Sequence, residues 1–430
     1  MNITNLTLLL NNYPVFKAKR ALANISAIPE DKYQEYIETK KNKIVNFHLS
    51  NNPFYKSKVV SKVWTWNELP VLTKSDIQTN FNDRLSIGVD KFYTGKTSGS
   101  TGNPFYFAKD KFTHALTWAN IENKFSNHGL YDKKQARFYG IPKNTKDYYL
   151  SRIKDVLMNR YRFDVFDLSD EAFAKWVINF KKNKYVFLNG YTTVLVAFAK
   201  YLLRQQLVLK DICPTVKNCV VTSEMCFEED RILMEKAFGV KVINEYGASE
   251  LDLIAFENTR GEWVLNTETL FVEVLDEDNK PVIDGEMGRI VITSLYNKAN
   301  SFIRYDIGDS GTIERINSKK VILKKLIGRN EDYVKLPSGK IAPGLSLYYV
   351  TKSIMEKNSV IKEIKVTQKT LVSFLIEYAS EAHLDNDQKQ EIKDALYEYL
   401  EPGLDISFQR LDMLKRSKSG KLKQFTSLIN

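Results

Sequence analysis

The residues best suited to chemistry lie in one short stretch, Thr97–Pro104, which reads Thr-Ser-Gly-Ser-Thr-Gly-Asn-Pro. Glycines let the backbone turn sharply and bring N–H groups close to a ligand, and hydroxyls add donors for phosphate oxygens. The stretch is not the usual nucleotide-binding P-loop, because Asp90 stands where that motif requires its first glycine. The glycine spacing also misses the dinucleotide-binding pattern. A phosphate-binding loop and an ordinary flexible loop are therefore both open at this point.

A second polar stretch, Asn244–Glu250, follows a predicted strand. In an open α/β sheet, ligands bind at the carboxyl ends of the strands. Tyr246 is a candidate for stacking on a base, and Glu250 is a candidate for holding a magnesium ion. The alternative is a plain strand-to-loop turn with a tyrosine in the core.

Three more polar stretches follow in chain order. Within Arg304–Asp309, the carboxylate of Asp309 is a candidate acceptor for ribose hydroxyls, and the alternative is a simple Gly-Asp turn. Within Gly328–Asp332, Arg329 is a candidate for binding phosphate or ribose oxygens, and the alternative is a polar linker. The last stretch is Ser417–Lys421, near the end of the given sequence, and its alternative interpretation is a solvated basic tail.

These stretches need a scaffold, and apolar strands alternate with helical patterns after the hydroxyl-rich loop. The helices predicted in this part span Lys109–His128, Ser169–Lys182, Thr192–Gln206 and Phe227–Phe238. The strands predicted between them span Ala136–Gly140, Tyr185–Leu188, Asn218–Ser223 and Lys241–Glu245. Strand and helix in alternation predict a largely parallel sheet covered on both faces.

The remaining parts of the chain are predicted to have different secondary structure. Residues 1–90 look mostly helical, and Ser75 or Asp76 is the expected N-cap of a helix near residue 75. Short strands with polar turns in residues 262–325 predict an antiparallel, barrel-like or meander region. A compact α+β unit follows, with expected helices over Ser346–Lys357 and Asn386–Leu400. We therefore expect two domains, residues 1–328 and 329–430.

Composition excludes several classes of protein. With 430 residues, of which 43% are hydrophobic and 27% charged, the chain is expected to be globular and to hold more than one domain. The net charge of +11 is spread among acidic residues, so no nucleic-acid partner is expected. No apolar run approaches the roughly 20 residues of a membrane helix, and no signal peptide is expected. The three cysteines match no zinc pattern and are expected to be reduced thiols of a cytoplasmic protein.

Taken in this order, the five stretches resemble the adenylate-forming superfamily of acyl-CoA synthetases, adenylation domains and luciferases. Within it, the chain is most similar to the phenylacetate–coenzyme A ligase-like branch, many of whose members belong to capsule and surface-polysaccharide pathways. The resemblance extends from Leu69–Lys74 to the Ser-Gly-Lys at residues 419–421. It implies an α/β fold, with a large N-terminal domain of α/β sheets plus a β-rich subdomain and a small, mobile C-terminal α+β domain.

The resemblance also implies an activity. A carboxylic acid is activated with ATP and Mg²⁺ as an acyl-adenylate, pyrophosphate is released, and the acyl group passes to a thiol such as coenzyme A or to an amine. The implied catalytic residues are Lys421, which bridges the substrate carboxylate and the α-phosphate, Glu250, which binds magnesium, and Arg329, beside ribose and phosphate. The implied nucleotide-binding residues are Thr97, Ser98, Gly99, Ser100, Thr101, Gly102, Glu245, Tyr246, Gly247, Ser249, Asp309 and Arg329.

Some positions depart from the pattern of the superfamily. Asn103 stands where many members have a lysine, so one cation that faces phosphate is absent. Leu251–Leu270 contains neither cysteine nor histidine, so the zinc site of several relatives is not expected. Three aromatic residues, Phe138, Tyr139 and Tyr191, are candidates for lining the acid pocket, although each is also suited to the core.

Two alternative functions stay open on the sequence. One is an aromatic-acid–coenzyme A ligase of catabolism rather than of capsule or surface polysaccharide biosynthesis. The other is a catalytically silent nucleotide-binding protein of the same fold. The presence of Lys421, Glu250 and Asp309 argues against the silent protein, because these are the residues that the chemistry needs.

Overall fold

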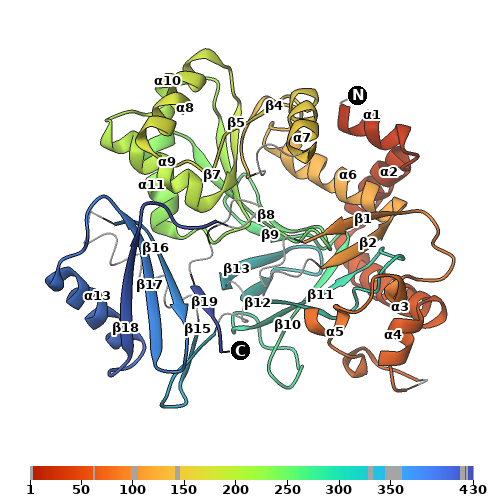
Figure 1. The fold of residues 1–430 in the computed structure, drawn as a ribbon. Coiled ribbons are helices and arrows are strands. Elements are labelled where there is room, and N and C mark those ends of the chain that lie inside the picture. Colours follow the sequence, from red (N-terminus) through yellow and green to blue (C-terminus); the bar gives the residue numbers. More distant parts are fainter. Residues whose placement is uncertain are drawn as a thin grey trace. The chain divides into compact units, whose positions relative to one another are not determined.

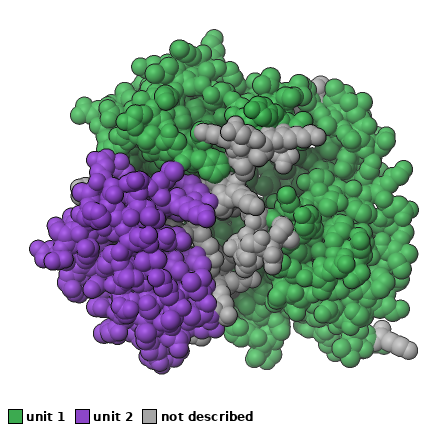
Figure 2. All heavy atoms as spheres, viewed as in Figure 1, with its two compact units in different colours: residues 1–326 green, residues 327–430 purple. Residues whose placement is uncertain are grey.

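The computed structural model describes residues 3–61, 63–97, 105–140, 146–327, 333–343, 361–416, 422 and 425–429. The chain divides into two compact units, residues 1–326 and 327–430, which are coloured separately in Figure 2. Several expectations fall outside the described residues: the loop residues Ser98–Pro104, the candidates Arg329 and Lys421, and the predicted helix Ser346–Lys357.

The first unit begins with helices, as the sequence indicates. They are α1 (Ile3–Leu10), α2 (Val15–Ser26), α3 (Glu30–Asn51), α4 (Pro53–Lys58) and α5 (Lys74–Ile77), with single turns at Trp66–Glu68 and Asn82–Arg84. The N-cap of α5 is Thr73, not Ser75 or Asp76. Asp76 instead takes the third helical position of a capping box, where its carboxylate accepts from the Thr73 backbone N–H at 2.8 Å.

The helices of the α/β part lie close to their predicted ranges. They are α6 (Lys111–Asn127), α7 (Lys146–Leu157), α8 (Asp170–Lys182), α9 (Thr192–Arg204), α10 (Leu209–Ile212) and α11 (Glu228–Phe238). Local chemistry explains their ends: Asp110 caps α6, Ser169 caps α8, and Gly239 closes α11 in the left-handed conformation at a φ of 67°. The helices α7 and α10 were not predicted from the sequence.

One sheet of eleven strands organises this unit (Figure 1). Its strands are β3 (Gln135–Phe138), β4 (Arg160–Arg162), β5 (Phe187–Tyr191), β6 (Asn218–Thr222), β7 (Lys241–Gly247), β8 (Leu253–Glu257), β9 (Trp263–Leu265), β10 (Leu270–Leu275), β11 (Gly288–Ser294), β12 (Tyr305–Arg315) and β13 (Val321–Ile327). Their order is β10-β11-β12-β13-β9-β8-β7-β6-β5-β3-β4. The predicted α/β class is confirmed, and the β-rich segment continues the parallel sheet as antiparallel strands.

The change of direction occurs between β7 and β8. Strands β3 to β7 are parallel, and β8 returns antiparallel to β7 through a short turn. The carboxyl end of β7 is therefore followed directly by a hairpin and not by a helix. This places the second polar stretch of the sequence at the junction of the parallel and antiparallel parts.

Helices cover both faces of the parallel part, and side chains alternate between these faces along each strand (Figure 1). On one face, Phe138 and Leu188 pack with aromatic residues of α8 and α9. On the other face, Phe187, Val220 and Ile243 pack with residues of α6. We call the second one the α6 face.

The second unit is α+β. It contains β14 (Tyr333–Lys335), β15 (Ile341–Pro343), β16 (Ile361–Gln368), β17 (Ser373–Ser380), α13 (Asn386–Tyr399), β18 (Asp405–Leu411) and β19 (Phe425–Ser427). Four strands form a sheet in the order β18-β17-β16-β19. The buried residues Ile392 and Leu396 of α13 join the core of this sheet. Among the helices of the described residues, none is long and apolar enough to cross a membrane.

A buried histidine in α3 makes the first unit sensitive to pH. His48 has no exposed surface, its Nε2 donates to the Asn297 carbonyl at 2.9 Å, and Ser86 lies 3.3 Å from its Nδ1. Burial lowers the pKa of His48 to about 4. The folded protein therefore keeps this ring neutral at a pH where the unfolded chain already binds a proton.

The stability that depends on neutral His48 is complete above pH ~6.5 and is lost as the pH falls toward 4. We expect this group to lower the free energy of unfolding by about 2 kcal/mol between pH 7 and pH 5. Urea unfolding at both pH values checks this, with His48→Gln as the variant that cannot titrate. A pH dependence that is equal in the two proteins contradicts the prediction.

Candidate functional site

The hairpin after β7 carries the stretch Asn244–Glu250. Tyr246 pairs with Ala255 of β8, the register shifts at Gly247, and the Ala248 backbone N–H donates to the Asp252 carbonyl at 3.1 Å. Gly247 pairs with Leu253, and a Cβ on this glycine would lie 3.1 Å from the Asp252 carbonyl oxygen. The turn is therefore tight, and it holds Glu250 a fixed distance beyond the end of the strand.

A bulge in β12 brings a second predicted residue to this hairpin. Asp306 pairs with Val291 of β11, whereas Ser310 pairs with Arg289, so β12 has extra residues between these positions. Gly308 lies in the bulge with a φ of 83°, a conformation that favours glycine. Bulges redirect side chains, and here the Tyr246 hydroxyl donates to Oδ2 of Asp309 at 2.6 Å. Two motifs that are far apart in the sequence thus meet at one hydrogen bond.

The candidate magnesium ligand, Glu250, is buried in the same hairpin. The hydroxyl of Tyr305, at the start of β12, donates to Oε1 of Glu250 at 3.3 Å. Magnesium is commonly held by one or two carboxylates together with water and substrate phosphates, so one buried carboxylate at this place fits the ion. Ser249 is exposed beside it. No cluster of three or more metal-binding side chains occurs in the described part of the chain.

The position of β12 depends on Arg304, which the sequence did not single out. Its side chain has no exposed surface, and it donates to the carbonyls of Asn67 at 3.0 Å and Leu69 at 2.9 Å. Its Nε forms an ion pair of 3.4 Å with Glu273, without hydrogen-bond geometry. The backbone adds two bonds, because Leu72 donates to the Arg304 carbonyl at 3.0 Å and accepts from the Asp306 N–H at 2.9 Å.

The hydroxyl-rich loop is bounded by two strands. β1 (Phe92–Lys96) and β2 (Tyr106–Asp110) pair antiparallel, and the Thr97 N–H donates to the Phe105 carbonyl at 2.9 Å. The sequence indicated a helix directly after the loop, but β2 comes first. Thr97 is the predicted loop residue that the structure describes, and its buried hydroxyl has no hydrogen-bond partner among the described residues.

Glu245, which precedes Tyr246, lies on the opposite face of β7. Alternation along the strand places Glu245 on the α6 face, and it borders a cavity of about 270 Å³. Other polar residues of the cavity wall on the strands of the sheet are Gln135, Arg137, Tyr139 and Asn189, and Asp132, Lys133 and Arg160 border the cavity as well. The structure thus brings Tyr246, Glu250 and Asp309 together and directs Glu245 to a separate cavity.

The aromatic candidates for an acid pocket separate in the same way. Tyr139 lines the cavity, and the ring of Tyr191 lies 5.0 Å from that of Tyr139. Phe138 instead faces the other side of the sheet, where its ring stacks on Phe163 at 4.8 Å. The alternation of polar and apolar residues along Gln135–Tyr139 is the signal that could have predicted this separation.

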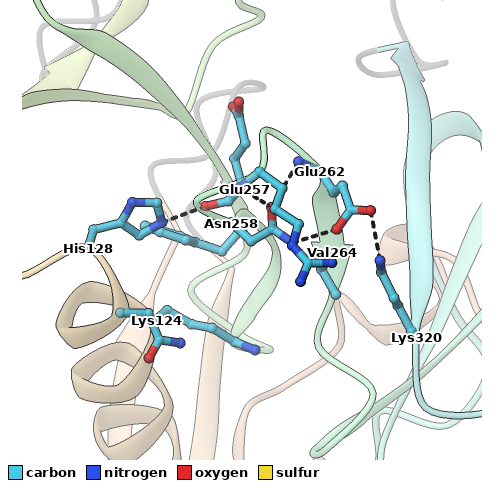
Figure 3. Close-up of a pocket in the computed structure, with 10 residues that line it drawn as sticks. Lys124, His128, Glu257, Asn258, Glu262, Val264 and Lys320 are labelled. Atoms are coloured by element: carbon cyan, nitrogen blue, oxygen red, sulfur yellow. Dashed lines mark hydrogen bonds and ion pairs between the residues drawn. The ribbon is translucent and has the colours of Figure 1, made fainter.

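Another pocket, of about 340 Å³, lies where the turn between β8 and β9 meets the end of α6 (Figure 3). Its wall includes His128, which donates to the Glu257 carbonyl at 2.8 Å, and Lys320, which pairs with Glu262 at 2.7 Å. None of the site residues predicted from the sequence lines it. Since its two acidic groups already have basic partners, we assign it no role in the chemistry.

Comparisons with known proteins agree with the fold. No model of a protein family matches the chain. The chain is similar to Protein CapK of Staphylococcus aureus, with 24% identity over 374 residues that cover 82% of this chain and 79% of CapK. It is similar in structure to 2-hydroxyisobutyryl-CoA ligase in the postadenylation state, with a TM-score of 0.69, 14% identity, and coverage of 93% of this chain and 90% of the ligase.

Two other solved structures share the fold over a smaller part of the chain. The anthranilate CoA ligase AuaEII matches with a TM-score of 0.51 and 14% identity over 76% of this chain and 65% of that protein. The amide bond synthetase McbA of Marinactinospora thermotolerans matches with a TM-score of 0.50 and 12% identity over 76% of this chain and 65% of the synthetase. The chain therefore has the fold of adenylate-forming ligases, and the resemblance inferred from its motifs is confirmed at the level of the fold.

The bond between Tyr246 and Asp309 predicts energetic coupling between the two motifs. We expect Tyr246→Phe to lower the free energy of unfolding by about 1 kcal/mol, because the partly buried carboxylate loses a donor. Asp309→Asn is expected to cost a similar amount. The double variant should cost clearly less than the sum, which urea unfolding of all four proteins measures. Strict additivity would show that the bond makes no net contribution.

Proposed function

We propose that the protein is an ATP-dependent ligase that activates a carboxylic acid as an acyl-adenylate and transfers the acyl group to a thiol, such as coenzyme A, or to an amine. The observation that carries the proposal is the hydrogen bond of Tyr246 to Asp309, next to the buried carboxylate of Glu250. Tyr246 and Glu250 come from the motif Asn244–Glu250, for which the family resemblance implies contacts with adenine and magnesium. Asp309 comes from the motif Arg304–Asp309, for which it implies contact with ribose. The shared fold of acyl-CoA ligases and an amide bond synthetase supports the same reaction class.

The chemistry of this reaction explains the residue types. An oxygen of the substrate carboxylate attacks the α-phosphorus of ATP, the bond to the bridging oxygen of the β-phosphate breaks, and pyrophosphate leaves. Two anions must meet, so positive charge is required where charge accumulates in the transition state. Glu250 would hold a magnesium ion, which would supply Lewis-acid stabilisation of the phosphates. Lys421 neutralises the carboxylate and the α-phosphate, and Arg329 lies beside the ribose and the phosphates.

The second step transfers the acyl group. A thiol or amine attacks the acyl carbonyl, the bond to the phosphate oxygen breaks, and AMP leaves. We propose that the small domain, residues 329–430, supplies Lys421 for the first step and moves away for the second. Mobile domains commonly complete and then open an active site in this way.

We place this ligase in the cytoplasm, in capsule or surface-polysaccharide biosynthesis. The motifs resemble those of the capsule-associated branch, and the similarity to Protein CapK supports the placement. An acyl transfer to a sugar or amino-acid amine fits such a pathway as well as transfer to coenzyme A does.

The test is carboxylate-dependent ATP–pyrophosphate exchange with Mg²⁺ over a panel of aryl, acyl and amino acids. We expect Lys421→Ala to lower exchange by about 100-fold or more while ATP binding measured by calorimetry persists, because the lysine acts in the transition state. Glu250→Gln should raise the Mg²⁺ concentration required, and chelation should abolish exchange. Lys415→Ala is the matched control, since this exposed lysine lies in the same segment outside the motif.

Two results would contradict the proposed function. If ATP does not bind at all, the chain does not act on this nucleotide. If ATP binds but no acid supports exchange, and Lys421→Ala changes nothing, the silent nucleotide-binding alternative holds.

A further inference from the structure

The cavity on the α6 face contains a charged group whose hydrogen bonds are incomplete among the described residues. Arg137, on β3, has its guanidinium over the ring of Tyr139 at 4.0 Å, and its buried Nε has no hydrogen-bond partner in the part of the chain that the structure describes. Burial lowers the pKa of Arg137 to about 10, so the group stays charged at neutral pH. A buried N–H of a guanidinium is costly unless something completes its hydrogen bond.

Asp155, an acidic side chain whose charge acts on Arg137, is already bound by two other arginines. Asp155 accepts from Arg160 at 2.5 Å and from Arg162 at 2.8 Å and 3.0 Å. Both of its oxygens are therefore engaged by other arginines. Within the part of the chain that the structure describes, no ion pair joins Arg137 to an acidic group.

Glu245 is the acidic group that β7 contributes to the cavity wall, which Asp132, Lys133 and Arg160 also border. Burial raises the pKa of its carboxyl, and a hydrogen bond from Thr222 and the charge of Arg137 partly offset this effect. Strand register places Glu245 beside Thr222 and places Arg137 beside Asn189. Glu245 on β7 and Arg137 on β3 thus lie on the same face of the sheet, two residues apart in register. The cavity lies beside both side chains.

Asn189 holds the polar wall between these two groups in place. Its Oδ1 accepts from Gln135 at 2.8 Å and from Tyr139 at 3.3 Å, and its Nδ2 donates to the Val220 carbonyl at 3.2 Å. The amide therefore cannot turn to satisfy Arg137 or Glu245. The opposite wall is apolar and includes Ile121 and Phe125 of α6.

The size of the cavity limits its occupant. A volume of about 270 Å³ corresponds to roughly nine water molecules at ~30 Å³ each. The occupant is therefore a small molecule with an apolar side toward α6 and polar groups toward the sheet. It lies next to β7, whose following residue, Tyr246, belongs to the proposed nucleotide site.

We propose that this cavity selects the acid, and that the substrate is a small carboxylic acid with a hydroxyl or amino substituent that donates to Glu245 and an additional oxygen that accepts from Arg137. This inference rests on the proposed function and names its substrate class. Glu245 and Arg137 are specificity-determining residues in this scheme. An unsubstituted hydrocarbon acid leaves Nε of Arg137 without an acceptor and gives Glu245 no donor beyond Thr222. Sites built to hydrogen-bond a substrate group discriminate strongly against an analogue that lacks the group.

The test compares acids that share a carbon skeleton and differ by one polar group. The panel is butanoate, 3-hydroxybutanoate and 3-aminobutanoate, with phenylacetate and mandelate as a larger pair. Glutarate and 3-hydroxyglutarate form a third pair, whose second carboxylate supplies the additional oxygen for Arg137. The value of kcat/KM for ATP–pyrophosphate exchange is measured for the full chain with Mg²⁺. We expect substituted acids to exceed their parents by at least about 100-fold, and the hydroxy and amino members show which donor is preferred.

The variants are Glu245→Gln and Arg137→Met, which remove one charge each at nearly constant size. Either change should lower the ratio of substituted to parent acid by about tenfold or more, whereas a merely structural role leaves this ratio unchanged. Arg260→Met is the matched control, because Arg260 is exposed and lines the other pocket. Thermal unfolding verifies that each variant is folded.

The outcomes separate this inference from the proposed function. Exchange that prefers the parent acids, or ratios that neither variant changes, overturns the inference while adenylation stands. If no acid supports exchange, calorimetry with the same panel decides: binding of the substituted acids that Glu245→Gln weakens supports the cavity assignment although the ligase proposal fails. If no acid of the panel binds or exchanges, the cavity assignment is overturned as well.

Discussion

The buried charge of Arg304 is the constraint on which the candidate site depends. A guanidinium without exposed surface must find acceptors inside the protein, and here these are backbone carbonyls of the Trp66–Leu69 segment together with the carboxylate of Glu273. Satisfying them fixes the N-terminal segment against the start of β12. The next residue, Tyr305, then reaches Glu250, and the bulge at Gly308 directs Asp309 to Tyr246.

The end of β7 gives two consecutive residues access to different faces of the sheet. Tyr246 lies on the side of Asp309, and Glu245 lies on the side of the cavity. In the proposed ligase, the nucleotide and the variable part of the acid are thus separated by the thickness of one strand. A shift of β7 moves Glu245 and Tyr246 together. Binding of the acid at Glu245 therefore affects the position of the nucleotide at Tyr246, and with it the approach of the carboxylate to ATP.

The hairpin between β7 and β8 makes this arrangement rigid. A crossover helix at this point would add a long connection, whereas the tight turn at Gly247 keeps Glu250 close to the strand end. The antiparallel strands that follow extend the same sheet, so β12 returns beside β11 and places its bulge near the turn. The side chains of Tyr246, Glu250 and Asp309 are therefore all positioned by strands of one continuous sheet.

The sequence by itself determined most helices and strands of the α/β part, though not α7, β4 or α10, because hydrophobic periodicity and caps such as Ser169 and Gly239 are local signals. It also determined the order of the motifs, and hence the fold of adenylate-forming ligases. Only the tertiary structure decided that Tyr246 bonds Asp309, that Arg304 is buried, and that Arg137 and Glu245 border one cavity. These relations depend on strand order, register and bulges, which join residues distant in the chain and leave little trace in local composition.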